Sequence, residues 1–310
     1  MKRIALLYPG QGSQKVGMGK DFYDNSSLAK EMIQKASDRL GQDITKLLFE
    51  PNDNLNQTQW TQPAILLVSS IATTLLKEGV DFSARYALGH SLGEFSALVA
   101  IGALGFEDGV ELVHKRGEFM SQAAQDKDGG MMVVMGLGDE EVEKICKEAR
   151  EEGKQVWPAN YNSDGQIVVA GIKSDLQEME SHFKEKGAKR AMLLNMSVAS
   201  HCPLMEEARV PLREYLERFI QESFQAPIIS NVSAQPYKSK AEAIELLDRQ
   251  LVEPVHYKHS IKNIEKDVDL FIELGEGNVL KGLNRRITKV PTINVSDMKS
   301  LEEAMEIIYR

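Results

Sequence analysis

The 310-residue sequence contains only two cysteines, Cys146 and Cys202. Neither belongs to a C-x-x-C pair, so the sequence supports neither a zinc site nor a disulfide framework. No stretch reaches the roughly 18 apolar residues that a membrane-spanning helix needs. The apolar run near the start stops at Tyr8, which is too short for the core of a signal peptide. We therefore expect a soluble, cytoplasmic protein with no membrane segment.

An excess of positive charge is also missing. Lys and Arg number 37 against 46 Asp and Glu, which gives a formal net charge of −9. This balance argues against a broad nucleic-acid-binding surface, and an acidic partner would need a local basic patch. With 42% hydrophobic and 27% charged residues, the composition is that of an ordinary globular protein. The length allows one large domain, or a large domain that carries a smaller one.

Apolar strand patterns alternate with helical patterns along most of the chain. Residues 3–10 predict a strand that ends in a Pro-Gly turn. The stretch 62–79 predicts a buried helix with Pro63 in its first turn and Gly79 just past its end. Strands that alternate with helices imply a mainly parallel sheet covered on both faces. We therefore expect an α/β fold.

A different pattern occupies residues 127–196. After a polar linker near Asp126, strands and amphipathic helices follow in the order β-α-β-β-α-β, with one helix starting at Asp139. This is the ferredoxin-like order. We expect a ferredoxin-like subdomain over 127–196, inserted into a larger α/β domain that comprises residues 1–126 and 197–310.

The segment Gly-His-Ser-Leu-Gly at residues 89–93 has the Gly-x-Ser-x-Gly pattern of a nucleophile elbow. A short apolar run precedes it, and a helical pattern follows over residues 92–104. Gly89 and Gly93 lack the Cβ atoms that would clash where strand and helix meet. Ser91 would then lie at a helix N-terminus, where free N–H groups favour developing negative charge. The pattern predicts a nucleophilic serine, with a simple helix cap as the alternative.

A serine nucleophile needs a base. The histidines of the sequence are His90, His114, His182, His201, His256 and His259. The one beside the serine should point away from it, and those within helical patterns favour surface roles. His201 lies between the predicted subdomain and the resumed larger domain, and such hinge segments line clefts. His256 and His259, near a loop after Pro254, also remain possible, and the pattern cannot exclude His256 in favour of His201.

A second glycine-bearing turn, Pro-Gly-Gln-Gly-Ser-Gln at residues 9–14, follows the first predicted strand. Its Gly10-x-Gly12 start is followed by Lys15 where a dinucleotide motif has a third glycine, and it lacks the Gly-Lys-Ser/Thr ending of a phosphate loop. We therefore expect no bound nucleotide. A backbone N–H of this turn would instead complete an oxyanion hole with the N–H of Leu92.

Segments in a specific order make the whole chain resemble the malonyl-coenzyme A:acyl carrier protein transacylases, which load malonyl groups for fatty-acid synthesis. These segments are PGQGSQ, QPAI, GHSLGE, RGEFMSQAA, NYNSDGQIVVAG, SVASHCPLM, QLVEPVHY and GEGNVLKGLNRRI. One such motif is weak evidence, whereas eight in the family's order are specific. The resemblance implies an α/β-hydrolase-like core with a mainly parallel sheet and a ferredoxin-like insertion.

The resemblance also implies a role for each matching residue. Ser91 is expected to be the nucleophile and His201 its base. The backbone N–H groups of Gln11 and Leu92 are expected to form the oxyanion hole. Gln250 is expected to orient His201 through its main-chain carbonyl, so a neutral acceptor replaces the acid of a Ser-His-Asp triad. A change of the Gln250 side chain need not then abolish activity.

Arg116 is expected to bind the malonyl carboxylate, and Asn160 or Asn162 to contact the pantetheine arm. A guanidinium presents a planar fork to a carboxylate and stays charged. In a desolvated pocket such a pair contributes roughly 1.5–3 kcal/mol, which favours malonyl over acetyl groups by one to two orders of magnitude. Without the resemblance, Arg116 next to Lys115 would be read as a surface residue on an exposed helix face.

The implied reaction is a ping-pong transfer from malonyl-coenzyme A to the pantetheine thiol of acyl carrier protein, through a malonyl-serine intermediate. It needs no metal and no organic cofactor. Since the family's carrier is strongly acidic and the family is usually monomeric, we expect a monomer with a local basic docking surface. The candidates are Lys281, Arg285, Arg286 and Lys289, or Lys184, Lys186, Lys189 and Arg190.

Other functions share parts of this pattern. A serine esterase or thioesterase would have the same elbow, but its usual chain order places an acid between the serine and the histidine. The nearby carboxylates here fall on helix faces of the predicted subdomain. A non-catalytic scaffold with a degenerate elbow is a second alternative. An acyltransferase of the same family with another acyl preference is a third.

Overall fold

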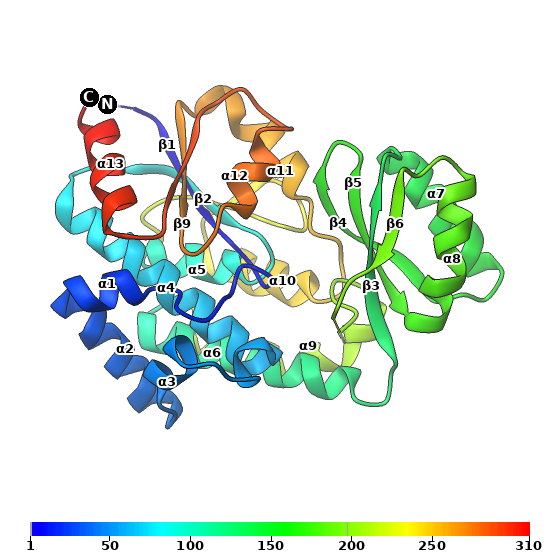
Figure 1. Cartoon of the computed structure of the whole chain (residues 1–310), viewed down its shortest axis with the longest axis horizontal. Helices are drawn as coiled ribbons and strands as arrows, with labels where there is room; N and C mark the ends of the chain where they lie inside the picture. Colours follow the sequence, from blue (N-terminus) through cyan, green and yellow to red (C-terminus); the bar gives the residue numbers. More distant parts are fainter. Residues whose placement is uncertain (1, 197) are drawn as a thin grey trace.

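Strands of two different sheets organise the chain in the computed structural model, which describes residues 2–196 and 198–310 (Figure 1). The strands of the larger sheet are β1 Ile4–Tyr8, β2 Ala84–Gly89, β7 Ile228–Ile229, β8 Pro236–Tyr237, β9 Leu270–Leu274 and β10 Thr292–Val295. Those of the smaller sheet are β3 Gly129–Met135, β4 Val156–Ser163, β5 Gln166–Ile172 and β6 Arg190–Leu193. The strand orders are β10-β9-β1-β2-β7-β8 and β4-β5-β3-β6.

The larger sheet is parallel except at one edge. β1 pairs with β2 and β9, β9 with β10, and β2 with β7, all in parallel, whereas β8 runs antiparallel to β7. Every residue of β1 is buried, with Ile4, Leu6 and Tyr8 in one hydrophobic cluster and Ala5 and Leu7 in another. A strand buried on both faces needs covering layers on both sides. The predicted first strand and the mainly parallel α/β sheet are therefore confirmed.

Helices fill the connections between the strands. The α-helices are α1 Lys20–Asn25, α2 Ser27–Leu40, α3 Ile44–Phe49, α4 Thr58–Gly79, α5 Gly93–Ala100, α6 Phe106–Ala124, α7 Asp139–Glu151, α8 Lys173–Glu185, α9 Arg209–Phe219, α10 Lys240–Gln250, α11 Tyr257–Ile264, α12 Val279–Asn284 and α13 Met298–Tyr309. Short 3-10 helices lie at Asn54–Asn56, Pro203–Ala208 and Glu265–Asp267. Within residues 2–196 and 198–310, no helix combines the length and the apolar character needed to cross a bilayer.

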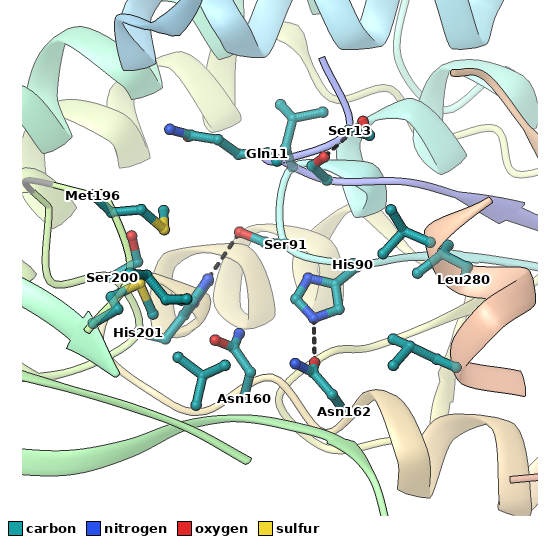
Figure 2. Close-up of a pocket in the computed structure, with 18 of the residues that line it drawn as sticks. Gln11, Ser13, His90, Ser91, Asn160, Asn162, Met196, Ser200, His201 and Leu280 are labelled. Carbon is teal, nitrogen blue, oxygen red and sulfur yellow. Dashed lines mark hydrogen bonds between the residues drawn. The ribbon is translucent and has the colours of Figure 1, made fainter. Parts of the chain in front are cut away.

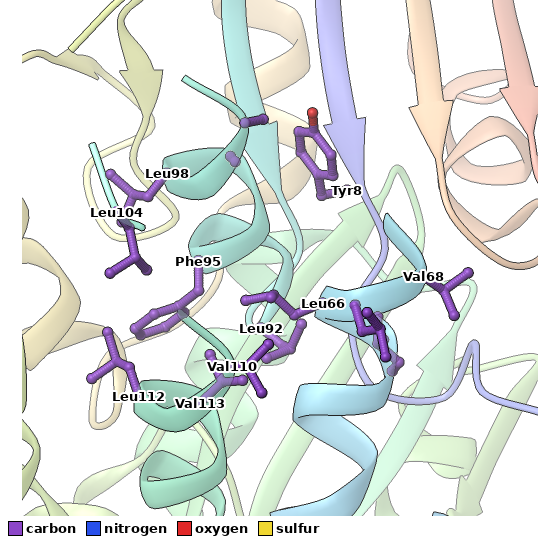
Figure 3. Close-up of a cluster of buried hydrophobic side chains, with 14 of the residues drawn as sticks. Tyr8, Leu66, Val68, Leu92, Phe95, Leu98, Leu104, Val110, Leu112 and Val113 are labelled. Atoms are coloured by element: carbon purple, nitrogen blue, oxygen red, sulfur yellow. The ribbon is translucent and has the colours of Figure 1, made fainter. Parts of the chain in front are cut away.

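Helices α4, α5 and α6 build the main hydrophobic core on one face of the larger sheet (Figure 3). Leu66 of α4, Phe95 of α5 and Val113 of α6 belong to this core and are fully buried. On the opposite face, Tyr257 of α11 and Leu280 of α12 pack in the second cluster with the alternate residues of β1. The turn from β2 into α5 is therefore held between two packed layers.

Helix α4 begins at Thr58, earlier than the sequence pattern indicated, so Pro63 lies inside the helix and Gly79 is its last residue. A proline cannot donate to the carbonyl four residues before it, which here belongs to Gln59. The Nδ1 of His114 in α6 lies 2.7 Å from that carbonyl oxygen and replaces the missing donor. The prediction that Pro63 would lie in the first turn was wrong because a partner on another helix compensates for the proline.

Helix α5 ends at Ala100, which makes it shorter than the predicted stretch 92–104. Gly102 adopts a φ of +74°, so the chain turns out of the helical path. Leu104 then forms an isolated bridge with Ile220. The apolar pattern continues past the helix because this turn is buried too.

The smaller sheet is antiparallel throughout and forms its own layer at one end of the molecule (green in Figure 1). Helices α7 and α8 share a hydrophobic cluster with alternate strand residues such as Met132 and Val134, and α7 begins at Asp139 as predicted. Residues of the other face, including Met131 and Val168, belong to the main core cluster. The architecture is thus mixed α/β, with a mainly parallel sheet and a separate antiparallel one.

Ion pairs and a close backbone approach join the two layers. Lys258 of α11 lies 2.7 Å from Asp139 at the start of α7 and 3.2 Å from Asp164, between β4 and β5. Where the chain passes between the two layers, a Cβ placed on Gly129 would lie 3.1 Å from the Cβ of Ala199. The chain therefore enters the smaller sheet and returns from it at neighbouring points.

Candidate active site

Ser91 lies in the turn between β2 and α5, with a φ of +53°. Few non-glycine residues adopt this left-handed conformation, and those that do cluster at functional turns. The turn is tight, since a Cβ on Gly89 would lie 2.0 Å from the carbonyl carbon of Gly93. A Cβ on Gly93 would lie 2.0 Å from the carbonyl oxygen of Tyr8. Both glycines are therefore required by sterics, as expected for an elbow.

His201 lies next to the serine. Its Nε2 is 2.8 Å from Ser91 Oγ (Figure 2), and its Nδ1 is 2.7 Å from the main-chain oxygen of Gln250. A carbonyl oxygen can only accept, so Nδ1 carries the proton and Nε2 accepts from the serine hydroxyl. His201 also has a positive φ, at +61°. The structure thus brings together the three residues that the resemblance placed in one catalytic group.

Burial keeps His201 neutral. Desolvation, reinforced by the positive charge of Arg116, lowers the pKa of His201 to about 3. A neutral imidazole at physiological pH is available to accept a proton. The geometry and the protonation state therefore both suit a general base.

Arg116 is fully buried in α6, at 1% exposure, rather than on an exposed helix face. One terminal nitrogen donates to Gln62 Oε1 at 2.8 Å, and the other donates to Gln250 Oε1 at 3.0 Å and to Ser91 Oγ at 3.3 Å. Burial lowers the pKa of Arg116 to about 10, which leaves it charged at neutral pH. A guanidinium therefore faces the serine hydroxyl, held by two amides rather than by an acid.

Gln11 and Leu92 line the same pocket as Ser91. Gln11 lies in the turn after β1 (Figure 2), and Leu92 directly follows the serine in the sequence. Within residues 2–196 and 198–310, neither backbone N–H has a hydrogen-bond partner. Two unpaired N–H groups beside a nucleophile suit the stabilisation of an oxyanion.

The pocket beside Ser91 lies between the two sheets. Asn160 and Asn162 of β4 line it from the side of the smaller sheet (Figure 2). Asn162 Oδ1 lies 2.7 Å from His90 Nε2, so His90 is engaged there and points away from the serine, as expected. The apolar part of the lining includes Met120, Met131, Val168, Leu194, Leu280 and Leu283.

The other histidines lie outside this pocket. His256 and His259 face each other at 3.3 Å between their Nδ1 atoms, and the ring of His256 stacks on Tyr161. His114 forms a hydrogen bond with the Gln59 carbonyl of α4, and His182 lies in α8. Of His201 and His256, it is therefore His201 that lies within hydrogen-bonding distance of Ser91 Oγ.

Both basic clusters lie at the surface. The cluster in and after α12 adjoins the pocket, because Leu280 and Leu283 of that helix line it. Within the cluster Arg286 lies 3.4 Å from Gln166 of β5 and so reaches across toward the smaller sheet. Lys189 and Arg190 are exposed at the start of β6. Among the residues that the structure describes, no group of three or more His, Cys, Asp or Glu side chains could hold a metal ion.

Three buried polar residues next to the site were not identified from the sequence: Gln62, Glu94 and Asn231. Glu94 follows the elbow motif directly, but a glutamate in the first turn of a helix is ordinarily exposed. Asn231 follows a strand of only two residues, in a stretch that reads as apolar. The sequence carried no signal that distinguishes these side chains from helix or loop residues elsewhere.

Comparison with known proteins identifies the family. The acyl transferase domain model matches residues 5–300. The malonyl CoA-acyl carrier protein transacylase of Bacillus subtilis is 40% identical over 99% of this chain and 98% of its own length. The crystal structure of malonyl-CoA:acyl carrier protein transacylase from Helicobacter pylori has 47% identity and a TM-score of 0.97, covering 100% of this chain and 99% of that one.

A further solved structure shows a malonyl-transacylase in complex with a type II PKS acyl-carrier protein. It is 37% identical, has a TM-score of 0.95, and the match covers 98% of this chain and 99% of that chain. Such identity over nearly the full length of each protein leaves no part of the chain unaccounted for. The chain therefore belongs to the acyl transferase family, within the malonyl-coenzyme A:acyl carrier protein transacylases.

Proposed function

We propose that this chain transfers the malonyl group of malonyl-coenzyme A to the pantetheine thiol of acyl carrier protein, in fatty-acid biosynthesis. The observation that carries the proposal is the position of Arg116. Its guanidinium donates to Ser91 Oγ at 3.3 Å, and its other hydrogen bonds in the described chain go to amide side chains. A buried cation without a direct acid partner, beside a nucleophile, suits an acyl group that carries its own carboxylate.

The first half-reaction forms a malonyl ester on Ser91. His201 Nε2 takes the proton of Ser91 Oγ as that oxygen attacks the thioester carbonyl carbon. The N–H groups of Gln11 and Leu92 stabilise the resulting oxyanion. When the carbon–sulfur bond breaks, His201 returns the proton to the sulfur and coenzyme A leaves as a thiol.

The second half-reaction runs the same steps with the carrier thiol. This thiol gives its proton to His201, and its sulfur attacks the ester carbonyl. The bond to Ser91 Oγ breaks, and the serine regains the proton from His201. Protons and acyl bonds are all that these steps move, so the proposed cycle needs no metal and no organic cofactor.

Substrate selection is assigned to the pocket around these groups. Arg116 is the proposed partner of the malonyl carboxylate, and Gln250 orients His201 through its carbonyl. Asn160 or Asn162, at the edge of the smaller sheet, is the proposed contact of the pantetheine arm. Asn162 is already bonded to His90, which favours Asn160 for this contact.

The acidic carrier is proposed to dock on basic residues beside the pocket. The cluster Lys281, Arg285 and Arg286 is favoured, since α12 lines the pocket and Arg286 extends toward the smaller sheet. The second candidate is Lys189 with Arg190. With a net charge of −9, the remaining surface repels an acidic partner, so a local patch must guide it. A monomer suffices for this arrangement, because one chain supplies every proposed group.

At the level of fold we propose a hydrolase-like core over 1–126 and 197–310 with a ferredoxin-like insertion over 127–196. Met1 and Ser197, which open the two core segments, lie outside the described residues. The strand order β4-β5-β3-β6 supports the proposal, since the second, third, first and fourth strands of a β-α-β-β-α-β unit then lie side by side. The elbow between β2 and α5 supports the hydrolase-like core.

The test is a transfer assay on the purified protein with malonyl-coenzyme A, with and without carrier. We expect malonyl carrier to form, and mass spectrometry to find a malonyl adduct on the parent that Ser91→Ala lacks. Arg116→Ala should lower malonyl transfer about 10- to 100-fold while acetyl transfer does not fall, because the variant lacks the partner of the malonyl carboxylate and an acetyl group has no carboxylate. Lys115→Ala, which removes the neighbouring cation of the same helix, is the matched control and should stay close to the parent.

Several results would contradict the proposal. Rapid release of free malonate without transfer would indicate a thioesterase. Absence of any adduct on Ser91 would indicate a non-catalytic protein. Unchanged activity of Arg116→Ala with malonyl-coenzyme A would indicate another acyl preference.

A further inference from the structure

The side chain of Asn231 bridges the two ends of the elbow turn. Its Oδ1 accepts from the backbone N–H of Ser91 at 2.7 Å, and its Nδ2 donates to the carbonyl oxygen of Gly89 at 2.7 Å. These two peptide groups flank His90, the middle residue between them. Asn231 is 1% exposed, so neither bond is shared with bulk water. One amide therefore holds the turn on both sides of the point at which the chain reverses.

Glu94 fixes Asn231 in turn. Its Oε2 accepts from the backbone N–H of Asn231 at 3.1 Å and from Gln250 Nε2 at 2.8 Å. Its Oε1 accepts from Tyr237 Oη at 3.0 Å. Glu94 is itself 1% exposed and belongs to the first turn of α5, three residues after the serine. The carboxylate thus collects donors from three segments that are distant in the sequence.

Both peptide groups of Ser91 are held by this network. Gln250 Nε2 donates to the carbonyl oxygen of Ser91 at 3.1 Å, while Asn231 accepts from its N–H. The same Gln250 accepts from Arg116 through Oε1 and from His201 through its main-chain oxygen. A shift of the network would therefore move the serine relative to both its base and the guanidinium.

We propose that Asn231 is a positioning residue that holds Ser91 in its left-handed conformation, with Glu94 as the anchor that orients Asn231. A residue in this conformation persists only where its surroundings over-determine it. Asparagine suits the position because its amide offers one acceptor and one donor, one for each side of the turn. An aspartate of the same shape would place an oxygen against the Gly89 carbonyl and a second negative charge beside Glu94.

The proposal rests on the assignment of Ser91 as the nucleophile in the proposed function. Misplacement of a reacting group by about 1 Å costs on the order of a hundredfold in rate. Asn231 lies behind the backbone of Ser91, and the lining of the acyl pocket does not include it. Loss of its side chain should therefore slow acylation and leave the binding of malonyl-coenzyme A unchanged.

The experiment compares Asn231→Ala with the parent in two measurements. The first is the rate of sulfonylation of Ser91 by phenylmethanesulfonyl fluoride, which reports the nucleophile without any acyl substrate. The second is single-turnover malonyl-enzyme formation, which separates the maximal rate from the concentration at half-maximal rate. We expect both rates to fall by at least roughly tenfold, with the half-maximal concentration of malonyl-coenzyme A within about threefold of the parent.

Asn284→Ala is the matched control. Asn284 is also a fully buried asparagine that joins two elements, through bonds to Tyr257 and Thr292, and neither of these bonds goes to the backbone of the elbow. It should lose comparable stability and keep both rates. If Asn231→Ala fails to fold, the isosteric Asn231→Asp replaces it, with the same expected loss.

The outcomes distinguish the positioning role of Asn231 from the proposed transfer function. Rates within tenfold of the parent in the folded Asn231 variant would overturn the positioning role, as would an equal loss in Asn284→Ala. A half-maximal concentration raised in proportion to the lost rate would also overturn it, because it would place Asn231 in binding. A parent that is sulfonylated on Ser91 yet transfers no malonyl group would contradict the proposed function while leaving the positioning role intact.

Discussion

Two residues with left-handed backbone conformations meet at the reaction centre, Ser91 at φ +53° and His201 at φ +61°. Such a conformation costs of order 1–3 kcal/mol for a non-glycine residue. Each is held by hydrogen bonds to a residue far away in sequence, Asn231 for the serine and the Gln250 carbonyl for the histidine. These two backbone conformations therefore direct the side chains of Ser91 and His201 toward each other from separate segments.

The protonation of Glu94 gives a prediction about stability. Burial raises the pKa of Glu94 from an ordinary 4.5 to about 7, so the folded state keeps a proton that the unfolded state has lost. The stability contributed by this group is complete below pH 4.5 and is lost as the pH rises toward 7. Glu94→Gln cannot titrate. The unfolding free energy of the parent minus that of Glu94→Gln should therefore fall by up to about 3 kcal/mol between pH 4.5 and 7.

Urea denaturation of both proteins across this pH range measures the difference. The lowered pKa of His201 works in the opposite direction, but it is common to both proteins and cancels. Glu303→Gln, which removes an exposed carboxyl on α13, serves as the control and should not reproduce the fall seen for Glu94→Gln. A constant difference for Glu94→Gln would show that this carboxyl titrates normally.

At the scale of single residues, the sequence predicts the groups that carry a motif and misses those that support them. Ser91 follows from its flanking glycines, whose spacing between a strand pattern and a helix pattern is visible in the local sequence. His201 could not be separated from His256 by pattern, because the distance to the serine depends on long-range packing. Arg116 looked exposed because its helix position next to Lys115 says nothing about Gln62 across the core.

Among the helices, α4 depends on a neighbour for its continuity. Pro63 leaves the Gln59 carbonyl without a helical donor. The Nδ1 of His114 in α6 lies 2.7 Å from this carbonyl oxygen and takes the place of that donor. His114 also packs its ring against Trp60, with 4.6 Å between centroids. A histidine that reads as a surface residue in the sequence thus completes the hydrogen bonding of another helix.

His114→Ala should lower the unfolding free energy by about 1–3 kcal/mol, since a carbonyl then remains without a partner. In the Pro63→Ala background the same change should cost less, because the new backbone N–H at position 63 can donate to Gln59. Urea denaturation of the two single variants and the double variant measures this coupling. Strictly additive losses would show that His114 contributes only packing.

The elements themselves were predictable to different degrees. Long periodic stretches such as α7 and strands bounded by Pro-Gly turns such as β1 follow from local patterns. The start of α4 did not, because the residues before Pro63 are helical only with the help of α6. β7 has two residues, and such a short strand is defined by its neighbour β2 rather than by its own sequence.

Over the whole molecule, charge is distributed unevenly around the cleft. The protein is acidic overall, yet Lys281, Arg285 and Arg286 lie in and after the helix that lines the pocket. The steady-state kcat/KM for the carrier should therefore fall roughly tenfold from low salt to about 0.5 M salt. Arg285→Glu should lower the low-salt value and flatten its dependence on salt.

Lys299→Glu changes the same charge on α13, at the end of the molecule opposite the smaller sheet (Figure 1), and should leave the salt dependence unchanged. Lys189→Glu tests the second basic cluster in the same assay. If only Lys189→Glu changed the salt dependence, the docking surface would instead lie beside β6. A flat salt response of the parent would count against both clusters.

The close approach of Gly129 to Ala199 makes the intervening stretch an exchangeable cassette. Its two ends emerge side by side, and it supplies one wall of the chamber while the serine, the histidine and the arginine stay behind on the other body. Replacement of this stretch in one piece would therefore change the wall that carries Asn160 and Asn162, whereas Arg116 and the basic cluster of α12 would stay unchanged. The groups proposed for the chemistry and for malonyl recognition thus come from one part of the chain, and the proposed pantetheine contacts come from another.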